Sequence, residues 1–320
     1  MTRADNRVAG IDCGTNSIRL LIADPDPGTG RLRDVHREMR IVRLGQGVDE
    51  TGAFAPEAIA RTRAALVDYA ELLAAHQVNR LRMVATSAAR DAANRDEFFA
   101  MTAEVLGAVI PGAVAQVITG QDEAALSFRG AVGELDSAGE PFVVVDLGGG
   151  STEIVLGDSS GAVTASFSAD IGCVRLTERC LHSDPPSRAE VADARAVVRE
   201  RLDAALQVVP VQRAHTWVGV AGTMTTLSAL AHHMTVYDAA AIHLSRVDCD
   251  ALVTVCQQLI TMTREQRIAL GPMHPGRADV IGGGAIVVQE LAQTLRQQAG
   301  ITELVVSEHD ILDGITLSIA

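Results

Sequence analysis

The sequence predicts an α/β protein made of two domains with the same internal plan. The stretch DLGGGSTEIVLGD, which starts at Asp146, is rich in glycine and lies between apolar runs, as in a tight β-hairpin. A similar stretch, DCGTNSIRLLIAD, starts at Asp12. MVATSAAR, from Met83, and VGVAGTMTTL, from Val218, each lead from an apolar strand into a helix. The repeated hairpin and the repeated strand-to-helix turn indicate a duplicated pair of α/β domains that face each other across a cleft.

The two hairpins correspond position by position. Residues 8–11 and 142–145 are the apolar strands that enter the two bends. The aligned pairs are Asp12 with Asp146, Gly14 with Gly148, Ser17 with Ser151, and Arg19 with Glu153. Glycine lets backbone N–H groups approach a ligand closely, and the hydroxyl groups add further donors. Both bends therefore suit the oxygens of a phosphate.

One aligned pair gives the two bends different chemistry. Arg19 offers a guanidinium to a phosphate, so the first bend suits anion binding directly. Glu153, together with Asp146, offers two hard oxygen ligands of the kind that Mg²⁺ accepts. The alternative is that Arg19 and Glu153 form an ion pair with each other.

Later segments add anion-binding turns and a candidate base. The turns ATSAAR and AGTMTT direct helix N-terminal N–H groups and hydroxyls toward the same cleft. VITGQDEAALSFRGA, from Val117, begins as a strand, turns at Gly120 and continues as a helix. Glu123 lies in the first turn of that helix, where an acid commonly complements the helix dipole. Because the chain crosses there from one domain to the other, Glu123 is also a candidate general base.

Three other segments have structural interpretations. PPSRAEVADARAVVRERLDAALQVV, from Pro185, predicts an amphipathic helix capped by Ser187, with a packing or dimer surface. RLRDVHREMRIVRLGQG, from Arg31, interleaves basic and acidic residues, as on a solvated strand. IGGGAIVVQELAQTL, from Ile281, either lets two helices approach closely or places backbone beside a ligand.

The composition supports two ordinary cores and no membrane-spanning segment. Of the 320 residues, 48% are hydrophobic and 3% are aromatic, so the cores should be aliphatic. The start, MTRADNRVAGID, enters a strand without an apolar leader, and no apolar run reaches the length of a membrane span. The five cysteines form no Cys-x-x-Cys pair, which favours reduced core thiols. We therefore expect a soluble, cytoplasmic protein.

The charged residues narrow the function classes. All 27 basic residues are arginine, so a Walker A, Schiff-base or kinase-type lysine is excluded. The net charge of −13 would repel nucleic acid, and we expect no nucleic-acid partner. A polyanionic substrate must therefore be held by backbone amides, a metal ion and a few local arginines.

Seven motifs, in order along nearly the whole chain, resemble the exopolyphosphatase/guanosine pentaphosphate phosphatase (Ppx/GppA) family. They are DCGTNSIRLL, ATSAARDAAN, ITGQDEAAL, VVDLGGGSTEIVLG, DIGCVRLTE, VGVAGTMTTL and RADVIGGGA. That family belongs to the superfamily of actin, sugar kinases and heat-shock chaperone ATPases. The resemblance implies two ribonuclease-H-like domains, residues 1–125 with about 303–320 and residues 126–302, and a homodimer.

The resemblance also implies an activity and a set of site residues. The activity is Mg²⁺-dependent release of the terminal phosphate of inorganic polyphosphate by water, with Glu123 as general base and Arg90 as a catalytic phosphate contact. The implied substrate-binding residues are Asn16, Ser17, Arg19, Gly148, Gly149, Ser151, Gly222 and Thr223. The implied metal ligands are Asp146 and Glu153. Cys173 also matches a family position, with packing as its simplest role.

The chain departs from the family pattern at two places. Thr15 replaces a serine and keeps the hydroxyl. In the C-terminal segment SEHDILDG, from Ser307, Asp310 stands where the family has glycine and Leu312 where it has arginine. The missing arginine bears on the docking of the C-terminal segment or on the charge of the cleft. A catalytically weak regulator that binds polyphosphate or a nucleotide is therefore one alternative.

Two enzyme alternatives remain as well. The chain ends where the two domains end, without the added helical domains of longer family members. That favours short polyphosphates, or pppGpp as the substrate of a 5′-phosphohydrolase. The other alternative is an ATP-dependent kinase of the same superfamily. Against a kinase, the sequence has no acceptor-sugar motif, and Glu123 suits water better than an alcohol.

Overall fold

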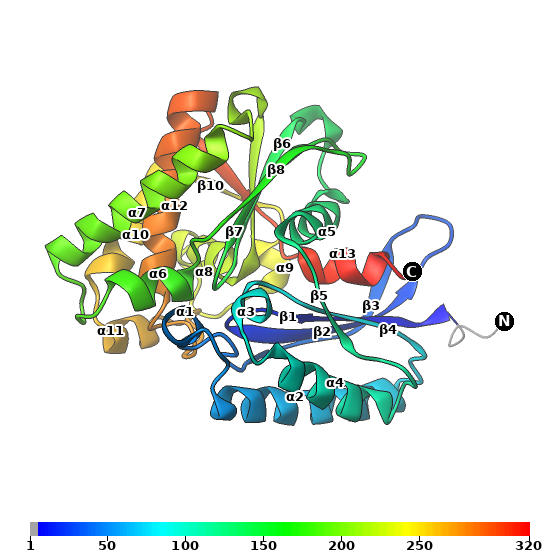
Figure 1. Cartoon of the computed structure of the whole chain (residues 1–320). Helices are drawn as coiled ribbons and strands as arrows, with labels where there is room; N and C mark the ends of the chain where they lie inside the picture. The colour runs from blue at the N-terminus through cyan, green and yellow to red at the C-terminus, as the bar shows by residue number, and fades with distance from the viewer. Residues whose placement is uncertain (1–5) are drawn as a thin grey trace. The chain divides into compact units, whose positions relative to one another are not determined.

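The structure contains two sheets, one in each of two compact units. The computed structural model describes residues 6–320. Unit 1 extends to Gly130 and includes Ile311–Ala320, and unit 2 comprises Ala131–Asp310. Helices pack on the sheet of each unit (Figure 1). The α/β class predicted from the sequence is confirmed.

Unit 1 is built on a five-stranded sheet. Its strands are β1 (Val8–Cys13), β2 (Ser17–Pro25), β3 (Leu32–Ile41), β4 (Arg80–Ala85) and β5 (Ala115–Val117). The spatial order is β3-β2-β1-β4-β5, with β1 antiparallel to β2 and parallel to β4. Strand β1 is buried along its whole length because both faces are covered. Helices α2 (Pro56–Ala75) and α4 (Arg95–Gly107) cover one face and α13 (Ile311–Leu317) the other (Figure 1).

Side chains of β2 alternate between two apolar layers, as the strand pleat requires. Leu20 joins the core that includes residues of α2 and α4, whereas Leu21 joins a cluster with Leu312 of α13. Asp313 of α13 accepts two hydrogen bonds from the guanidinium of Arg37 on β3. The C-terminal helix is therefore docked on the sheet of unit 1. Leucine at position 312 contributes to that docking as an apolar contact.

Three further helices begin in unit 1, and the last of them extends into unit 2. They are α1 (Val48–Thr51), α3 (Ser87–Asp91) and α5 (Gly120–Val132). Helix α3 follows β4 directly, and α5 begins shortly after β5, as the sequence predicts. Helix α5 then carries the chain from unit 1 into unit 2.

Unit 2 is built on a six-stranded sheet with the order β10-β11-β9-β6-β7-β8. Its strands are β6 (Phe142–Leu147), β7 (Thr152–Gly157), β8 (Val163–Ala169), β9 (Thr216–Val220), β10 (Ser245–Asp248) and β11 (Glu303–Val306). Its helices are α6 (Cys173–Cys180), α7 (Arg188–Leu206), α8 (Ala221–Ala231), α9 (Ala239–Ile242), α10 (Cys249–Thr261), α11 (Arg264–Ile268) and α12 (Ile281–Ala299). Helix α12 packs between α7 and α10 (Figure 1). Trp217 of β9 is the largest fully buried side chain of the core.

The two sheets are connected in the same way. The order β8-β7-β6-β9-β11 in unit 2 repeats the order β3-β2-β1-β4-β5 in unit 1, and β10 is an addition at the edge. The pairing directions agree too, since β6 is antiparallel to β7 and parallel to β9. This is the arrangement expected of two ribonuclease-H-like units, and it confirms the duplication seen in the sequence.

One predicted boundary needs correction. The sequence predicts that the chain from about residue 303 belongs to the first domain. However, β11 is hydrogen bonded between β9 and β10 in the sheet of unit 2. Only the segment from Ile311 belongs to unit 1, because α13 packs on β1, β2 and β4.

Several local predictions are confirmed. Ser187 caps α7 in a capping box with Glu190. Strand β3 is an edge strand whose residues are mostly half-buried or exposed. The glycines of α12 let helices approach: a Cβ atom at Gly283 would lie 2.8 Å from the carbonyl oxygen of Cys173 in α6. All five cysteines are free thiols. Within residues 6–320, none of the helices combines the length and apolar character needed to cross a membrane.

The docking of α13 can be tested at Gly314. A Cβ atom there would lie 1.9 Å from the carbonyl oxygen of Leu126 in α5, a backbone atom that cannot rotate away. We expect Gly314→Ala to lower the free energy of unfolding by about 1–3 kcal/mol or more, the usual cost of overpacking. Gly133→Ala is the control, since a Cβ there meets nothing within 4 Å. Urea denaturation of both variants measures the difference, and equal stabilities would contradict this account of the docking.

Candidate active site

The two predicted bends have the same backbone geometry. In unit 1 the N–H of Gly14 donates to the carbonyl of Ser17 at 2.9 Å, and in unit 2 the N–H of Gly148 donates to the carbonyl of Ser151 at 3.0 Å. The antiparallel register places Asp12 opposite Arg19 and Asp146 opposite Glu153. Because directly opposed residues project from the same face of a sheet, each bend presents two charged side chains together.

In unit 1, the bend holds Arg19 through an ion pair. Its guanidinium donates to one carboxylate oxygen of Asp12, from Nη2 at 2.6 Å and from Nε at 3.0 Å. Asn16 anchors the bend, since its carbonyl accepts from the N–H groups of Val42 and Arg43 at 3.1 and 2.8 Å. Asp12 was not among the predicted site residues. The alignment of Asp12 with the predicted metal ligand Asp146 was the signal that could have identified it.

The structure brings Arg90 and Glu123 together. Arg90 lies in α3, and its Nη1 donates to Oε2 of Glu123 at 2.6 Å and to the carbonyl of Ile118 at 3.2 Å. Glu123, in the first turn of α5, is 7% exposed. Helices α3 and α5 thus bring an arginine and a buried acid, both predicted from the sequence, into direct contact.

The environment of Glu123 changes its acidity. Burial raises the pKa of Glu123, and the negative charge of Asp12 raises it further. The charge and hydrogen bond of Arg90, and a hydrogen bond with Thr86, act in the opposite direction. The net effect is a pKa above the ordinary glutamate value. A buried carboxylate with such a pKa has the chemistry of a general base.

In unit 2, helix α6 fixes the glycine-rich bend. The N–H of Cys173 donates to the carbonyl of Gly148 at 3.0 Å, and the N–H of Val174 donates to the carbonyl of Gly149 at 2.9 Å. A Cβ atom at Gly172 would lie 2.3 Å from the carbonyl oxygen of Gly149, so the approach requires glycine. Burial raises the pKa of Cys173 to about 11, so its thiol stays protonated. Cys173 thus supports the bend by packing.

Asp146 and Glu153 form an acidic pair on facing positions of β6 and β7. They are 6% and 1% exposed, and Ser168 Oγ donates to Oε1 of Glu153 at 2.7 Å. Two buried carboxylates on one face of a hairpin are hard oxygen donors, the ligands that Mg²⁺ prefers. The donor set therefore fits the metal that the sequence implies.

The start of α8 contains Gly222 and Thr223, and it is contacted by Arg277, a residue that was not predicted from the sequence. Nη1 of Arg277 donates to the carbonyl of Gly222 at 3.3 Å and to Oγ1 of Thr226 at 3.4 Å. A Cβ atom at Gly222 would lie 2.3 Å from Cζ of Arg277. Ala221 has a left-handed backbone, with φ of 70°. Arg277 stands in the motif RADVIGGGA, which carried the family resemblance, and that was the available signal.

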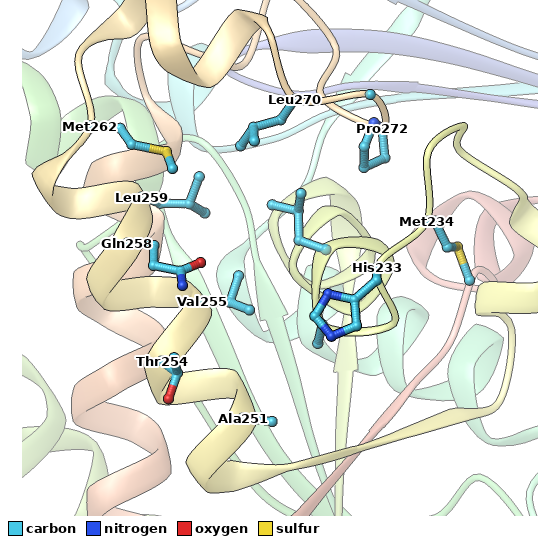
Figure 2. A pocket seen from close by; sticks show the side chains of 13 residues that line it. His233, Met234, Ala251, Thr254, Val255, Gln258, Leu259, Met262, Leu270 and Pro272 are labelled. Carbon is cyan, nitrogen blue, oxygen red and sulfur yellow. The ribbon is translucent and has the colours of Figure 1, made fainter.

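A separate pocket of unit 2 has a different character. It has a volume of about 510 Å³ and is lined by residues of α8, α10 and the segment around Leu270 and Pro272 (Figure 2). Most of its lining is apolar, as Val255, Leu259 and Met262 illustrate, and it includes none of the predicted site residues. This pocket is therefore not the phosphate site.

The fold and the bends define the class of protein: two ribonuclease-H-like units, each with a glycine-containing hairpin bend after a buried strand. A profile of the Ppx/GppA phosphatase family matches residues 21–319. The chain belongs to that family, as the motifs of the sequence predict.

Individual relatives agree with this family. Exopolyphosphatase 2 of Mycobacterium tuberculosis is 74% identical over 316 residues, which cover 98% of each chain. A crystal structure of an exopolyphosphatase-like protein is 42% identical, with a TM-score of 0.91 over 97% of this chain and 98% of the other. The PPX-GPPA enzyme of Aquifex aeolicus is 31% identical, with a TM-score of 0.78 over 98% of this chain and 99% of the other.

The contact between Gly222 and Arg277 gives a test of whether this guanidinium contributes to phosphate binding. Gly222→Ala would push the guanidinium of Arg277 aside, and the side chain can move because it is flexible. We expect binding of tripolyphosphate to weaken about 10-fold or more, the value of one charge-assisted hydrogen bond, with little loss of stability. Titration calorimetry and thermal unfolding measure the two quantities. Gly107→Ala, where the nearest atom lies at 3.9 Å, is the control. Unchanged affinity in Gly222→Ala would rule out this role of Arg277.

Proposed function

We propose that this chain is an exopolyphosphatase that releases the terminal phosphate of inorganic polyphosphate with the help of Mg²⁺. The observation that carries the proposal is the contact between Arg90 and the buried carboxylate of Glu123. A basic carboxylate held beside a guanidinium is what activation of water next to a phosphate needs. The name of the 74% identical relative, Exopolyphosphatase 2, supports the substrate class.

Glu123 acts as the general base in this proposal. Its raised pKa makes the carboxylate a stronger base than an ordinary glutamate toward the attacking water. Arg90 fixes the orientation of the carboxylate through the hydrogen bond from Nη1 at 2.6 Å. The remaining N–H groups of that guanidinium are the donors we assign to the phosphate, because arginine has five in a planar fork.

The other predicted residues hold substrate and metal. Arg19 donates to Asp12 in the structure, and in this proposal its guanidinium also contacts phosphate. The hydroxyls and backbone N–H groups of the two bends and of the α8 start supply further donors. They belong to Asn16, Ser17, Gly148, Gly149, Ser151, Gly222 and Thr223. Asp146 and Glu153 would hold Mg²⁺, which neutralises negative charge on the phosphates when bound.

Hydrolysis of pppGpp is the second candidate function. Its 5′ end carries the same terminal phosphoanhydride, and the family to which the chain belongs is named for both activities. A regulator without turnover is another alternative from the sequence, besides the kinase. The docked α13 gives that alternative no support, because Leu312 packs in an apolar cluster on the sheet.

The Glu123→Gln variant tests the proposed base. It keeps the size of the side chain and removes the basic oxygen, so we expect tripolyphosphate binding to persist while turnover falls about 100-fold or more. The measurement is phosphate release from short polyphosphate, long polyphosphate, pppGpp and ATP, with and without Mg²⁺. The wild-type rates rank the substrates. Near-normal turnover in Glu123→Gln would refute the base, and binding without release in the wild type would favour the regulator.

The pH profile tests the raised pKa. Glu123 must be ionised to act as a base, so turnover should fall as the pH drops through its raised pKa, above the ordinary value of 4.5. The charge of Arg90 lowers that pKa, so Arg90→Gln should move the acidic limb to higher pH. Arg90→Lys keeps the charge and is the control, with a limb close to that of the wild type. A limb at the same pH in all three proteins would contradict the electrostatic coupling.

A further inference from the structure

Three potential metal ligands meet in unit 2, apart from the acidic bend. Glu134 follows α5, His243 directly follows α9, and His309 lies between β11 and α13. One ligand atom from each of these residues lies within 4.8 Å of the other two. Oε2 of Glu134 is 2.9 Å from Nε2 of His243 and 3.9 Å from Nδ1 of His309. The centroids of the two imidazole rings are 4.4 Å apart.

We propose that Glu134, His243 and His309 form a binding site for Zn²⁺. Two imidazoles and one carboxylate are a common protein ligand set for zinc with one open position. Ligand atoms around a tetrahedral Zn²⁺ lie roughly 3.4 Å from one another, given metal–ligand distances of about 2.0–2.2 Å. The two measured separations from Glu134, 2.9 and 3.9 Å, lie on either side of that value. The third separation, between the ligand atoms of the two imidazoles, is at most 4.8 Å, so binding requires the side chains to draw together around the ion.

The backbone around His309 is fixed in a way that presents the ring. Oγ of Ser307 accepts from the N–H of His309 at 3.0 Å and donates to its carbonyl at 2.8 Å. The side chains of Glu134, His243 and His309 are 35%, 19% and 34% exposed, so an ion from solvent can reach them. Because the cluster is half-exposed and its backbone is held locally, binding of a metal ion costs little free energy of dehydration. The exposed side also leaves room for a water ligand.

Metal binding requires a proton to move on His243. The N–H of Glu308 donates to Nδ1 of His243 at 3.3 Å, so the metal-free ring carries its proton on Nε2 and donates it to Glu134. For Nε2 to bind a metal, the proton moves to Nδ1 and the long bond from Glu308 is lost. Zn²⁺ then replaces the proton between His243 and Glu134, and the net proton count of the ring is unchanged.

Two residues of the cluster lie next to the points where the chain passes from one unit to the other. The chain passes from unit 1 to unit 2 between Gly130 and Ala131, and returns between Asp310 and Ile311. Glu134 lies shortly after the first passage and His309 directly before the second. Zn²⁺ would therefore tie together, within unit 2, the two segments that connect the units. His309 also lies in SEHDILDG, the segment that departs from the family pattern.

The donor chemistry separates this site from the proposed Mg²⁺ site. Asp146 and Glu153 offer only carboxylate oxygens, which suit a hard cation, whereas imidazole nitrogens favour zinc and its neighbours. An excess of Mg²⁺ should therefore not displace Zn²⁺ from the histidines. The proposal also does not depend on the exopolyphosphatase activity, since binding can be measured without turnover.

The test is a metal titration of the full chain and two double variants. The wild type is stripped with a chelator and titrated with Zn²⁺ by calorimetry, and with Co²⁺ to record the visible absorption of a tetrahedral site. We expect one saturable site, with affinity at least about 100-fold weaker in His243→Ala/His309→Ala, because even outer-shell partners are worth 10–100-fold. The control is His232→Ala/His233→Ala, which removes two exposed histidines outside the cluster.

Each result decides the proposal. Loss of the site in the first double variant alone, with Mg²⁺ unable to compete, supports it. Equal affinity in both double variants, or absence of saturable Zn²⁺ binding by the wild type, overturns it and leaves the cluster as a set of hydrogen-bonded side chains. Circular dichroism checks folding. If the first double variant is unfolded, Glu134→Gln, which keeps the side-chain shape, replaces it under the same two outcomes.

Discussion

Each of the two predicted bends depends on one backbone hydrogen bond, from a glycine N–H across a four-residue bend to a serine carbonyl. In unit 1 the bond joins Gly14 and Ser17, and in unit 2 it joins Gly148 and Ser151. This hydrogen bond closes the hairpin tightly, so the two strands stay paired in register up to the bend. Register then decides which side chains face each other, because a slip of one residue would turn each of them to the opposite face of the sheet. The geometry is duplicated, and a single aligned exchange places arginine opposite Asp12 in one bend and glutamate opposite Asp146 in the other.

The absence of lysine shapes how this protein handles phosphate. With net charge −13 and arginine as the only strong cation, positive charge is available only where a guanidinium is placed. The structure pairs Arg19 with Asp12 and Arg90 with Glu123, so these cations are held in position by carboxylates. A carboxylate occupies part of the planar fork and leaves other N–H groups for a second partner. Lysine, with its compact and strongly hydrated charge, would not be oriented in the same way.

The sequence predicted the features that depend on neighbouring residues and missed those that depend on distant ones. Glycines, hydroxyls and alternating apolar residues identified both hairpins, and Glu123 was placed in the first turn of its helix by the preceding turn at Gly120. By contrast, β11 was assigned to the wrong unit, because its position is fixed by pairing with β9, far away in the sequence. Two other contacts join distant segments, and no local sequence pattern predicts them. They are the approach of Arg277 to Gly222 and the contact of His243 with His309.

The buried acid at the start of α5 shows how substrate and base can be coupled. Burial and the charge of Asp12 raise the pKa of Glu123, while the charge of Arg90 lowers it, so the basicity of the carboxylate is a balance. If Arg90 contacts phosphate as proposed, the negative charge of the substrate offsets the positive charge that acts on Glu123. The effect of Arg90, which lowers the pKa of Glu123, then weakens, while burial and Asp12 still raise that pKa. The carboxylate would become more basic when a phosphate is bound beside it, and less basic when the site holds only water.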